Sequence, residues 1–195
     1  NAEHALWNGA RLGVEGARER FSVDEVHATV EYAERIKEIL REHISLYIDL
    51  YSDSERLVEA KNAAQSLHST RGIKRHIRSI RDVTYMIRTL RLIKSEDEIE
   101  TIRHAISITA EAHHAAMRES RAGMREYQLQ AHMSYVFLNS GAMNEAYGAI
   151  VAGGNNANTL HYVDNRDELH EGDLVLIDAA CEWELYASDI TRTFP

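Results

Sequence analysis

The sequence has 195 residues, enough for one domain or for a small domain and part of a second. Hydrophobic residues make up 44% and charged residues 27%, and no apolar run approaches the ~20 residues that a membrane-spanning helix needs, so we expect no membrane contact. The single cysteine, Cys181, excludes an internal disulfide framework and favours a reducing compartment, the cytoplasm.

The net charge of −9 is unevenly distributed along the chain. Residues 1–94 carry 16 basic and 14 acidic side chains, whereas residues 95–195 carry 6 basic and 17 acidic ones. Because affinity for phosphates comes from Lys and Arg, the acidic half argues against general nucleic-acid binding, and we expect no nucleic-acid partner. A surplus of acidic side chains favours binding of a cation, although in other proteins it only increases solubility.

The first part of the chain has the pattern of a small α/β unit. Ser22 and Glu25 match a capping box, and apolar residues follow at helical spacing as far as position 40, which predicts a helix. The run 44–51 is rich in β-branched and aromatic residues and predicts a strand. A second helix is expected over about 54–67.

The segment 71–94 is strongly basic. It carries one acid, Asp82, against eight basic side chains: Arg71, Lys74, Arg75, Arg78, Arg81, Arg88, Arg91 and Lys94. One hypothesis is a phosphate-binding surface, and the other is a solvated face near a domain junction. The second is favoured, because aromatic residues and glycines are not interleaved as they are in nucleic-acid sites.

A domain boundary is expected near Lys94, between residues 1–93 and 94–195. Ser95 and Glu98 form a second capping box, which predicts a helix to about Arg121, and another helix is expected over 126–139. Short apolar runs then predict strands over 149–152, 173–178 and about 184–194. The pair His113 and His114 on the first helix has no catalytic context and is interpreted as filling core or surface.

Two aspartates frame the last strands. If a hairpin turns near Trp183–Glu184, Asp178 and Asp189 lie directly opposite each other, with Cβ atoms ~5 Å apart on one face. Such carboxylates repel, and one or two divalent cations remove the repulsion. Spacing alone leaves open the alternative of two unrelated, solvent-facing strand aspartates.

The residues around these aspartates resemble a known family. Leu176-Ile-Asp-Ala-Ala-Cys-Glu182, Tyr186-Ala-Ser-Asp-Ile-Thr-Arg-Thr-Phe-Pro195 and the upstream Leu160-His-Tyr-Val-Asp-Asn165 are similar to signatures of the aminopeptidase P and prolidase family of pita-bread metallopeptidases. The likeness extends weakly to Trp7–Gly13. It implies an α/β (α+β) fold in which a creatinase-like N-terminal domain, 1–93, precedes the first half of a pita-bread catalytic domain, 94–195.

The resemblance also implies roles for particular residues. Asp178 and Asp189 are expected to ligate two divalent metal ions, with Asp189 bridging them. The ions are expected to be Mn²⁺, with Co²⁺ or Zn²⁺ as alternatives. His161 is expected beside the metals as a catalytic residue, and Tyr147 near the substrate. The implied activity is that of a hydrolase: a metalloprotease, specifically an Xaa-Pro aminopeptidase, which releases the first residue from a peptide substrate with proline in the second position.

The pattern also differs from the family in its extent. The family completes its metal site with a histidine and two glutamates that lie further along the chain. We therefore expect this sequence to be incomplete at its C-terminus, inactive as the 195-residue piece, and part of a homo-oligomer when full length. Two alternatives stay open: a catalytically inactive relative that binds proteins, and a prolidase that acts on Xaa-Pro dipeptides.

Overall fold

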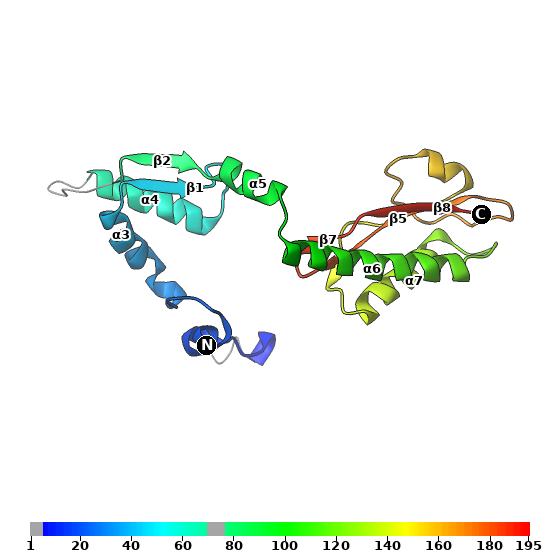
Figure 1. Ribbon diagram of the computed structural model, residues 1–195, viewed down its shortest axis with the longest axis horizontal. Coiled ribbons are helices and arrows are strands. Elements are labelled where there is room, and N and C mark those ends of the chain that lie inside the picture. Colours follow the sequence, from blue (N-terminus) through cyan, green and yellow to red (C-terminus); the bar gives the residue numbers. More distant parts are fainter. Residues whose placement is uncertain (1–5, 70–76) are drawn as a thin grey trace. The chain divides into compact units, whose positions relative to one another are not determined.

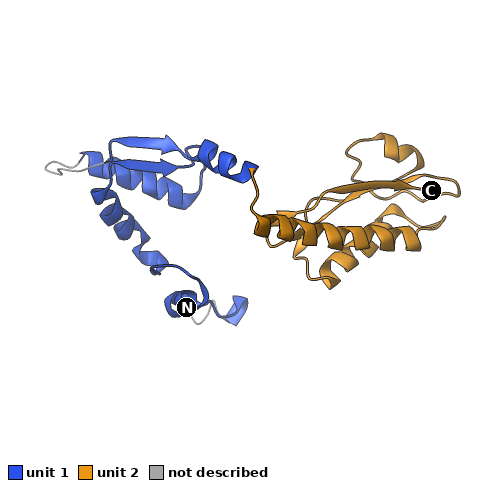
Figure 2. Ribbon diagram, viewed as in Figure 1, with its two compact units in different colours: residues 1–92 blue, residues 93–195 orange. Residues whose placement is uncertain are grey.

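The computed structural model describes residues 6–69 and 77–195. It divides into two compact units, residues 1–92 and 93–195 (Figure 1; Figure 2). Within the described ranges, no helix is both long enough and apolar enough to cross a membrane.

The first unit contains helices, a 3₁₀ turn and a two-stranded sheet. Its elements are α2 (Gly13–Arg20), η1 (Thr29–Glu31), α3 (Tyr32–Glu42), β1 (Ser45–Ile48), α4 (Glu55–Ser69), β2 (Ser79–Asp82) and α5 (Thr84–Leu92). The strands β1 and β2 are parallel, with Ser45 opposite Ser79 and Ile48 opposite Asp82. A parallel pair needs a crossover connection, and α4 supplies it.

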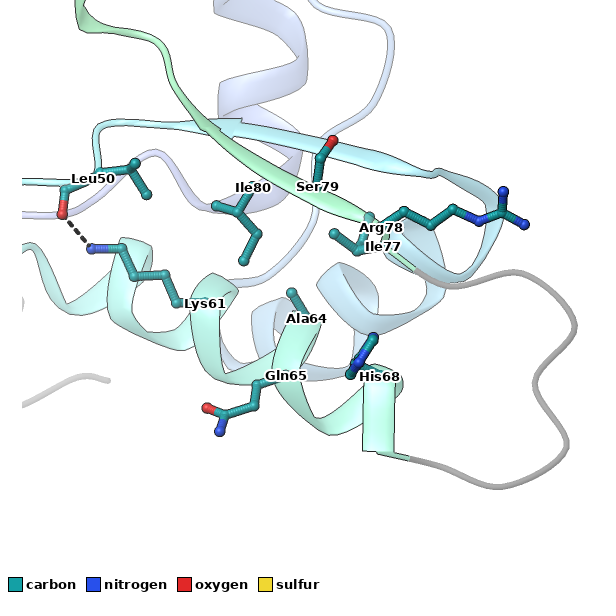
Figure 3. A pocket seen from close by; sticks show the side chains of 9 residues that line it. All are labelled: Leu50, Lys61, Ala64, Gln65, His68, Ile77, Arg78, Ser79 and Ile80. Carbon is teal, nitrogen blue, oxygen red and sulfur yellow. Dashed lines mark hydrogen bonds between the residues drawn. The ribbon is translucent and has the colours of Figure 1, made fainter.

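The core of this unit lies between α3, α4 and the sheet. Small side chains on α4 allow close packing, and the buried cluster is Leu40, Ala63, Ala64, Leu67 and Ile77, with Ile36 and Leu46 against it. A pocket of about 500 Å³ adjoins α4 and β2. Both Lys61 and Leu50 line this pocket, and Figure 3 shows the Lys61 ammonium directed to the carbonyl oxygen of Leu50, to which it donates a hydrogen bond of 3.0 Å.

Two expectations about the first unit need correction. The predicted helix from Ser22 is wrong over its first part, because α3 begins at Tyr32. The carboxylate of Glu25 does not cap a helix; it accepts a hydrogen bond of 3.1 Å from Arg35 and lies 2.8 Å from Nε2 of His27. The hydrogen bond with His27 is the main reason that the pKa of Glu25 is lowered.

The described part of the basic segment, residues 77–94, contains β2 and α5, which the sequence did not predict as separate elements. The predicted charges at Arg71, Lys74 and Arg75 lie outside the described residues. The strand expected over 44–51 and the helix expected over 54–67 are present as β1 and α4.

The second unit pairs two long helices with antiparallel strands. Its elements are α6 (Glu96–Glu119), α7 (Glu126–Asn139), β3 (Asn144–Glu145), β4 (Ile150–Gly153), η2 (Gly154–Asn158), β5 (Val175–Ala179), β6 (Cys181–Trp183), β7 (Tyr186–Ala187) and β8 (Ile190–Phe194). The strand orders are β4-β5-β8 and β3-β6-β7, with all neighbours antiparallel.

Helix α6 begins where the sequence predicted. The Oγ atom of Ser95 accepts a hydrogen bond of 3.3 Å from the Glu98 amide, and the Glu98 carboxylate accepts one of 2.7 Å from the Ser95 amide. This reciprocal capping satisfies amides that the first helical turn leaves unpaired. The predicted capping box is confirmed, and α7 has the predicted bounds.

The helices α6 and α7 pack against each other and against the strands, as Figure 1 shows for the second unit. Helix α6 contributes small buried residues, so that the larger side chains of α7 can approach closely. The most buried members of this core are Ala105, Ala112 and Ala116 from α6, Leu129, Met133 and Phe137 from α7, and Val151, Ile177, Ala179 and Cys181 from the strands.

Candidate metal centre

A β-hairpin spans residues 175–194 and carries both aspartates that were predicted as metal ligands. One half is the pair β5–β8 and the other the pair β6–β7, with an interruption of the ladder at Ala180 and at Ser188–Asp189. The strands are joined by Glu184 and Leu185, whose φ angles are both positive, 46° and 69°. A two-residue turn of this kind matches the right-handed twist of the flanking strands.

The register of the hairpin differs from the predicted one. Asp178 lies opposite Thr191 and not opposite Asp189, because the turn is centred on Glu184–Leu185 instead of Trp183–Glu184. The prediction of direct opposition is therefore wrong. The difference amounts to two positions along the second strand. Because side chains alternate with a period of two, Asp189 remains on the face that carries Asp178.

The hydroxyl group of Tyr147 joins the two carboxylates. Tyr147 lies between β3 and β4, and its Oη atom is 2.5 Å from Oδ1 of Asp178 and 3.0 Å from Oδ1 of Asp189. The two side chains therefore meet at one phenol, diagonally across the hairpin. Burial raises the pKa of Tyr147, and the hydrogen bonds to the carboxylates raise it further, so the phenol keeps its proton and donates at neutral pH.

Asp178 and Asp189 bring two like charges together at the Tyr147 hydroxyl. None of the ion pairs formed by the described residues involves either carboxylate. Asp178 is partly buried and Asp189 is exposed, so a ligand can reach the pair from solvent. Uncompensated carboxylate oxygens are the donors that hard divalent cations prefer. The donor chemistry therefore fits a divalent ion.

The carboxylate pair is only part of a coordination sphere. Over residues 6–69 and 77–195, no group of three or more His, Cys, Asp and Glu side chains is arranged to hold a metal ion. Divalent ions of this class take about six oxygen or nitrogen ligands. The two aspartates would supply two of them.

A buried polar cluster supports the interrupted part of the hairpin behind Asp189. The hydroxyls of Thr109 and Ser188 lie 2.7 Å apart, and both accept from the Cys181 amide, at 3.3 and 3.2 Å. All three residues are at most 3% exposed. The hydroxyls thus serve as acceptors for the Cys181 amide, while the Ser188 amide donates across the hairpin to the Cys181 carbonyl oxygen at 3.1 Å. No sequence pattern indicates this cluster, because Thr109 is 72 residues from Cys181.

His113 is a buried core residue beside the same hairpin. Its Nε2 atom lies 3.0 Å from the carbonyl oxygen of Ile190, the residue after Asp189. Burial lowers the pKa of His113, so the ring is neutral at pH 7 and Nε2–H can donate to that carbonyl. His113 therefore supports β8 from the core side, while His114 is exposed.

His161, the predicted catalytic histidine, lies in the segment between η2 and β5, and its side chain is exposed. No hydrogen bond among the described residues joins it to Asp178 or Asp189. The residues that follow it are held in place: Tyr162 donates to Glu126 at 2.7 Å, and Asn165 accepts from the Val151 amide at 2.9 Å. Glu126 was predicted only as the first residue of a helix, and its role in this loop was missed.

Comparison with known proteins identifies the family. Residues 100–195 match the family model described as metallopeptidase family M24, and residues 1–47 match the one described as the aminopeptidase P N-terminal domain. The chain belongs to metallopeptidase family M24. The family implies divalent metal ions, in agreement with the oxygen donors at the hairpin.

The M24 chain has relatives that match almost all of it. The Xaa-Pro aminopeptidase of Haemophilus influenzae is 39% identical over 189 residues, which are 97% of this chain and 42% of the relative. The Xaa-Pro aminopeptidase of Escherichia coli is 37% identical over 193 residues, 97% of this chain and 43% of the relative. The chain thus spans about two fifths of the length of these relatives.

Solved structures agree with the sequence matches. Proline aminopeptidase P II from Yersinia pestis superimposes with a TM-score of 0.91 at 37% identity, covering 100% of this chain and 45% of that one. A zinc-substituted Escherichia coli aminopeptidase P in complex with product gives a TM-score of 0.94 at 36% identity, covering 100% and 44%. The predicted fold, an N-terminal domain followed by the start of a catalytic domain, is confirmed.

Proposed function

We propose that the full-length protein is a metal-dependent aminopeptidase that removes the first residue from peptides with proline in the second position. The family and the activities for which its relatives are named support this proposal. The observation that carries it within this chain is the pair Asp178 and Asp189, which share the hydroxyl of Tyr147 and form no ion pair with any described residue.

Each side chain has a proposed task. Asp178 and Asp189 hold the divalent ions, which, when bound, lower the pKa of a coordinated water towards neutrality. Tyr147 keeps its proton at Oη and holds the two carboxylates in a fixed relation by donating to both. His161 is exposed and therefore accessible to a peptide, where it would donate a hydrogen bond to the carbonyl oxygen as negative charge develops.

Mn²⁺ is the proposed ion, because carboxylate oxygens suit hard cations, with Co²⁺ and Zn²⁺ as the alternatives. A zinc-substituted relative superimposes on this chain, so metal replacement is a practical test. The proposed compartment is the cytoplasm, where thiols stay reduced, since Cys181 is a free and buried thiol.

The test uses the full-length protein, stripped with a chelator and reloaded with a single metal. We expect Mn²⁺ to restore cleavage of an Xaa-Pro tripeptide, and Asp189→Asn to abolish it with a loss of bound metal. The matched control is Glu171→Gln, which neutralises an exposed carboxylate outside the proposed site. A wild-type protein that binds metal yet cleaves no Xaa-Pro peptide with any of the three ions would contradict the proposal.

The same assay separates the alternatives. Cleavage of an Xaa-Pro dipeptide in preference to the tripeptide indicates a prolidase. Absence of both metal binding and hydrolysis indicates an inactive relative that uses the fold for protein binding.

A further inference from the structure

Glu126 is a fully buried carboxylate that the proposed chemistry does not use. It is the first residue of α7 and is 0% exposed. Among the described residues, none forms an ion pair with it. An isolated buried carboxylate is costly unless hydrogen-bond donors surround it. The burial of this carboxylate therefore requires an explanation.

The donors to Glu126 account for its burial. Oε1 accepts from the Gly153 amide at 2.8 Å and from Nδ2 of Asn156 at 3.0 Å. Oε2 accepts from the hydroxyl of Tyr162 at 2.7 Å and from the Asp167 amide at 3.0 Å. The positive end of the α7 dipole also favours negative charge at this position.

These donors share one property: all of them lie in the segment 153–167. The donors come from the start, the middle and the end of this segment. Their residues also contact one another, since Nδ2 of Asn156 lies 3.1 Å from the Tyr162 hydroxyl and 2.9 Å from Oδ2 of Asp167. The segment carries His161, the residue before Tyr162. A single carboxylate thus organises the loop that presents the proposed catalytic histidine.

We propose that Glu126 is the positioning residue for His161. It acts through Tyr162 and the backbone of the loop, and it touches neither substrate nor metal. The effect expected on peptide hydrolysis rests on the proposed function. The effect expected on the order of the loop 153–167 does not.

The kinetic test is a double-mutant cycle in the full-length protein. Glu126→Gln keeps the shape but leaves an amide nitrogen facing a backbone N–H. We expect kcat/KM for an Xaa-Pro tripeptide to fall about 10- to 100-fold, as for other displaced catalytic groups. In a His161→Ala background, the same substitution should have no further effect. Glu111→Gln, on the exposed face of α6, is the matched control and should leave activity unchanged.

A second variant and a second readout keep the inference testable. Tyr162→Phe removes one of the four donors and should cause a smaller loss, again absent in the His161→Ala background. Amide hydrogen exchange over 153–167 should be faster in Glu126→Gln, with or without metal, while exchange in α6 is unchanged.

Several results would overturn the inference. These are wild-type activity in Glu126→Gln, an equal additional loss in the His161→Ala background, wild-type activity in His161→Ala itself, or unchanged exchange over 153–167. If the wild type hydrolyses no Xaa-Pro peptide, the proposed function fails, and the exchange result alone decides whether Glu126 organises the loop.

Discussion

Replacing Thr109 by Val removes a hydroxyl from the core while almost preserving the shape of the side chain. Thr109 is 0% exposed, and its Oγ1 atom lies 2.7 Å from Oγ of Ser188 and 3.3 Å from the Cys181 amide. After the substitution, Cys181 N–H keeps Ser188 as acceptor at 3.2 Å, so no backbone donor is left without a partner.

We therefore expect the free energy of unfolding to fall by about 1–2 kcal/mol, the contribution of one buried neutral hydrogen bond that is partly compensated. This corresponds to roughly 5- to 30-fold faster amide exchange through opening of the hairpin. The assay is native-state hydrogen exchange read by mass spectrometry over residues 175–190. Segments of the first unit provide an internal control.

A double-mutant cycle with Ser188→Ala isolates the contact between the two hydroxyls. We expect the two substitutions to be coupled by about 0.5–1.5 kcal/mol. Additive effects, with a coupling near zero, would refute the idea that Thr109 and Ser188 act as one unit behind Asp189.

Three further predictions concern the second unit. Burial, with a contribution from the hydrogen bond to Glu126, raises the pKa of Tyr162 from 10.0 to about 12, so the folded state holds the phenolic proton more tightly than the unfolded state. The contribution of Tyr162 to the free energy of unfolding is complete below pH ~10 and is lost as the pH rises towards 12. In denaturant titrations, the free energy of unfolding should therefore decline less steeply over this pH range in Tyr162→Phe than in wild type. Gly153→Ala places a Cβ atom 2.5 Å from Cδ2 of the buried Leu169 and should destabilise the folded state by about 1–3 kcal/mol in thermal unfolding. Gly148→Ala is the control and should be nearly neutral, because no atom lies within 4 Å of the added Cβ. Equal effects of the two substitutions would contradict the packing argument. Phe137→Ala should cost about 3–5 kcal/mol because the side chain is 1% exposed, whereas Leu138→Ala, at 64% exposure, should cost little, as urea midpoints would reveal.

The local part of the fold could be predicted from sequence. The capping box at Ser95 and Glu98 and the helical spacing that follows predicted α6, and the bounds of α7 were also correct. The same capping pattern at Ser22 and Glu25 was misleading, because the Glu25 carboxylate has stronger partners in His27 and Arg35. A local signal is overridden when a charged partner from elsewhere competes for the same side chain.

The carboxylate pair was predictable and its register was not. The motif around Asp178 and Asp189 indicated that the two side chains share a face, which the bonds to Tyr147 agree with. The turn was misplaced by one residue, because Glu184 and Leu185 are neither Gly nor Asn and give no sign of positive φ.

Long-range contacts account for most of what was missed. Strand β2 is short and half charged, so its pairing with β1 has no signature of its own. Glu126 read as an ordinary first-turn acid until the structure brought Gly153, Tyr162 and Asp167 around it. Neither hydrophobic periodicity nor capping rules report which distant donors will surround a buried oxygen.

The hairpin between Asp178 and Asp189 restricts how this part of the chain can vary. An insertion or deletion of one residue in the connecting turn would rotate Asp189 towards the core, whereas a change of two would merely slide it along the strand. The side chains at the tip, Glu184 and the 86% exposed Leu185, contact little, so they can be exchanged for residues that tolerate a positive φ, such as Gly, Asn and Asp. Related sequences should therefore differ in the composition of this tip but conserve its odd or even length.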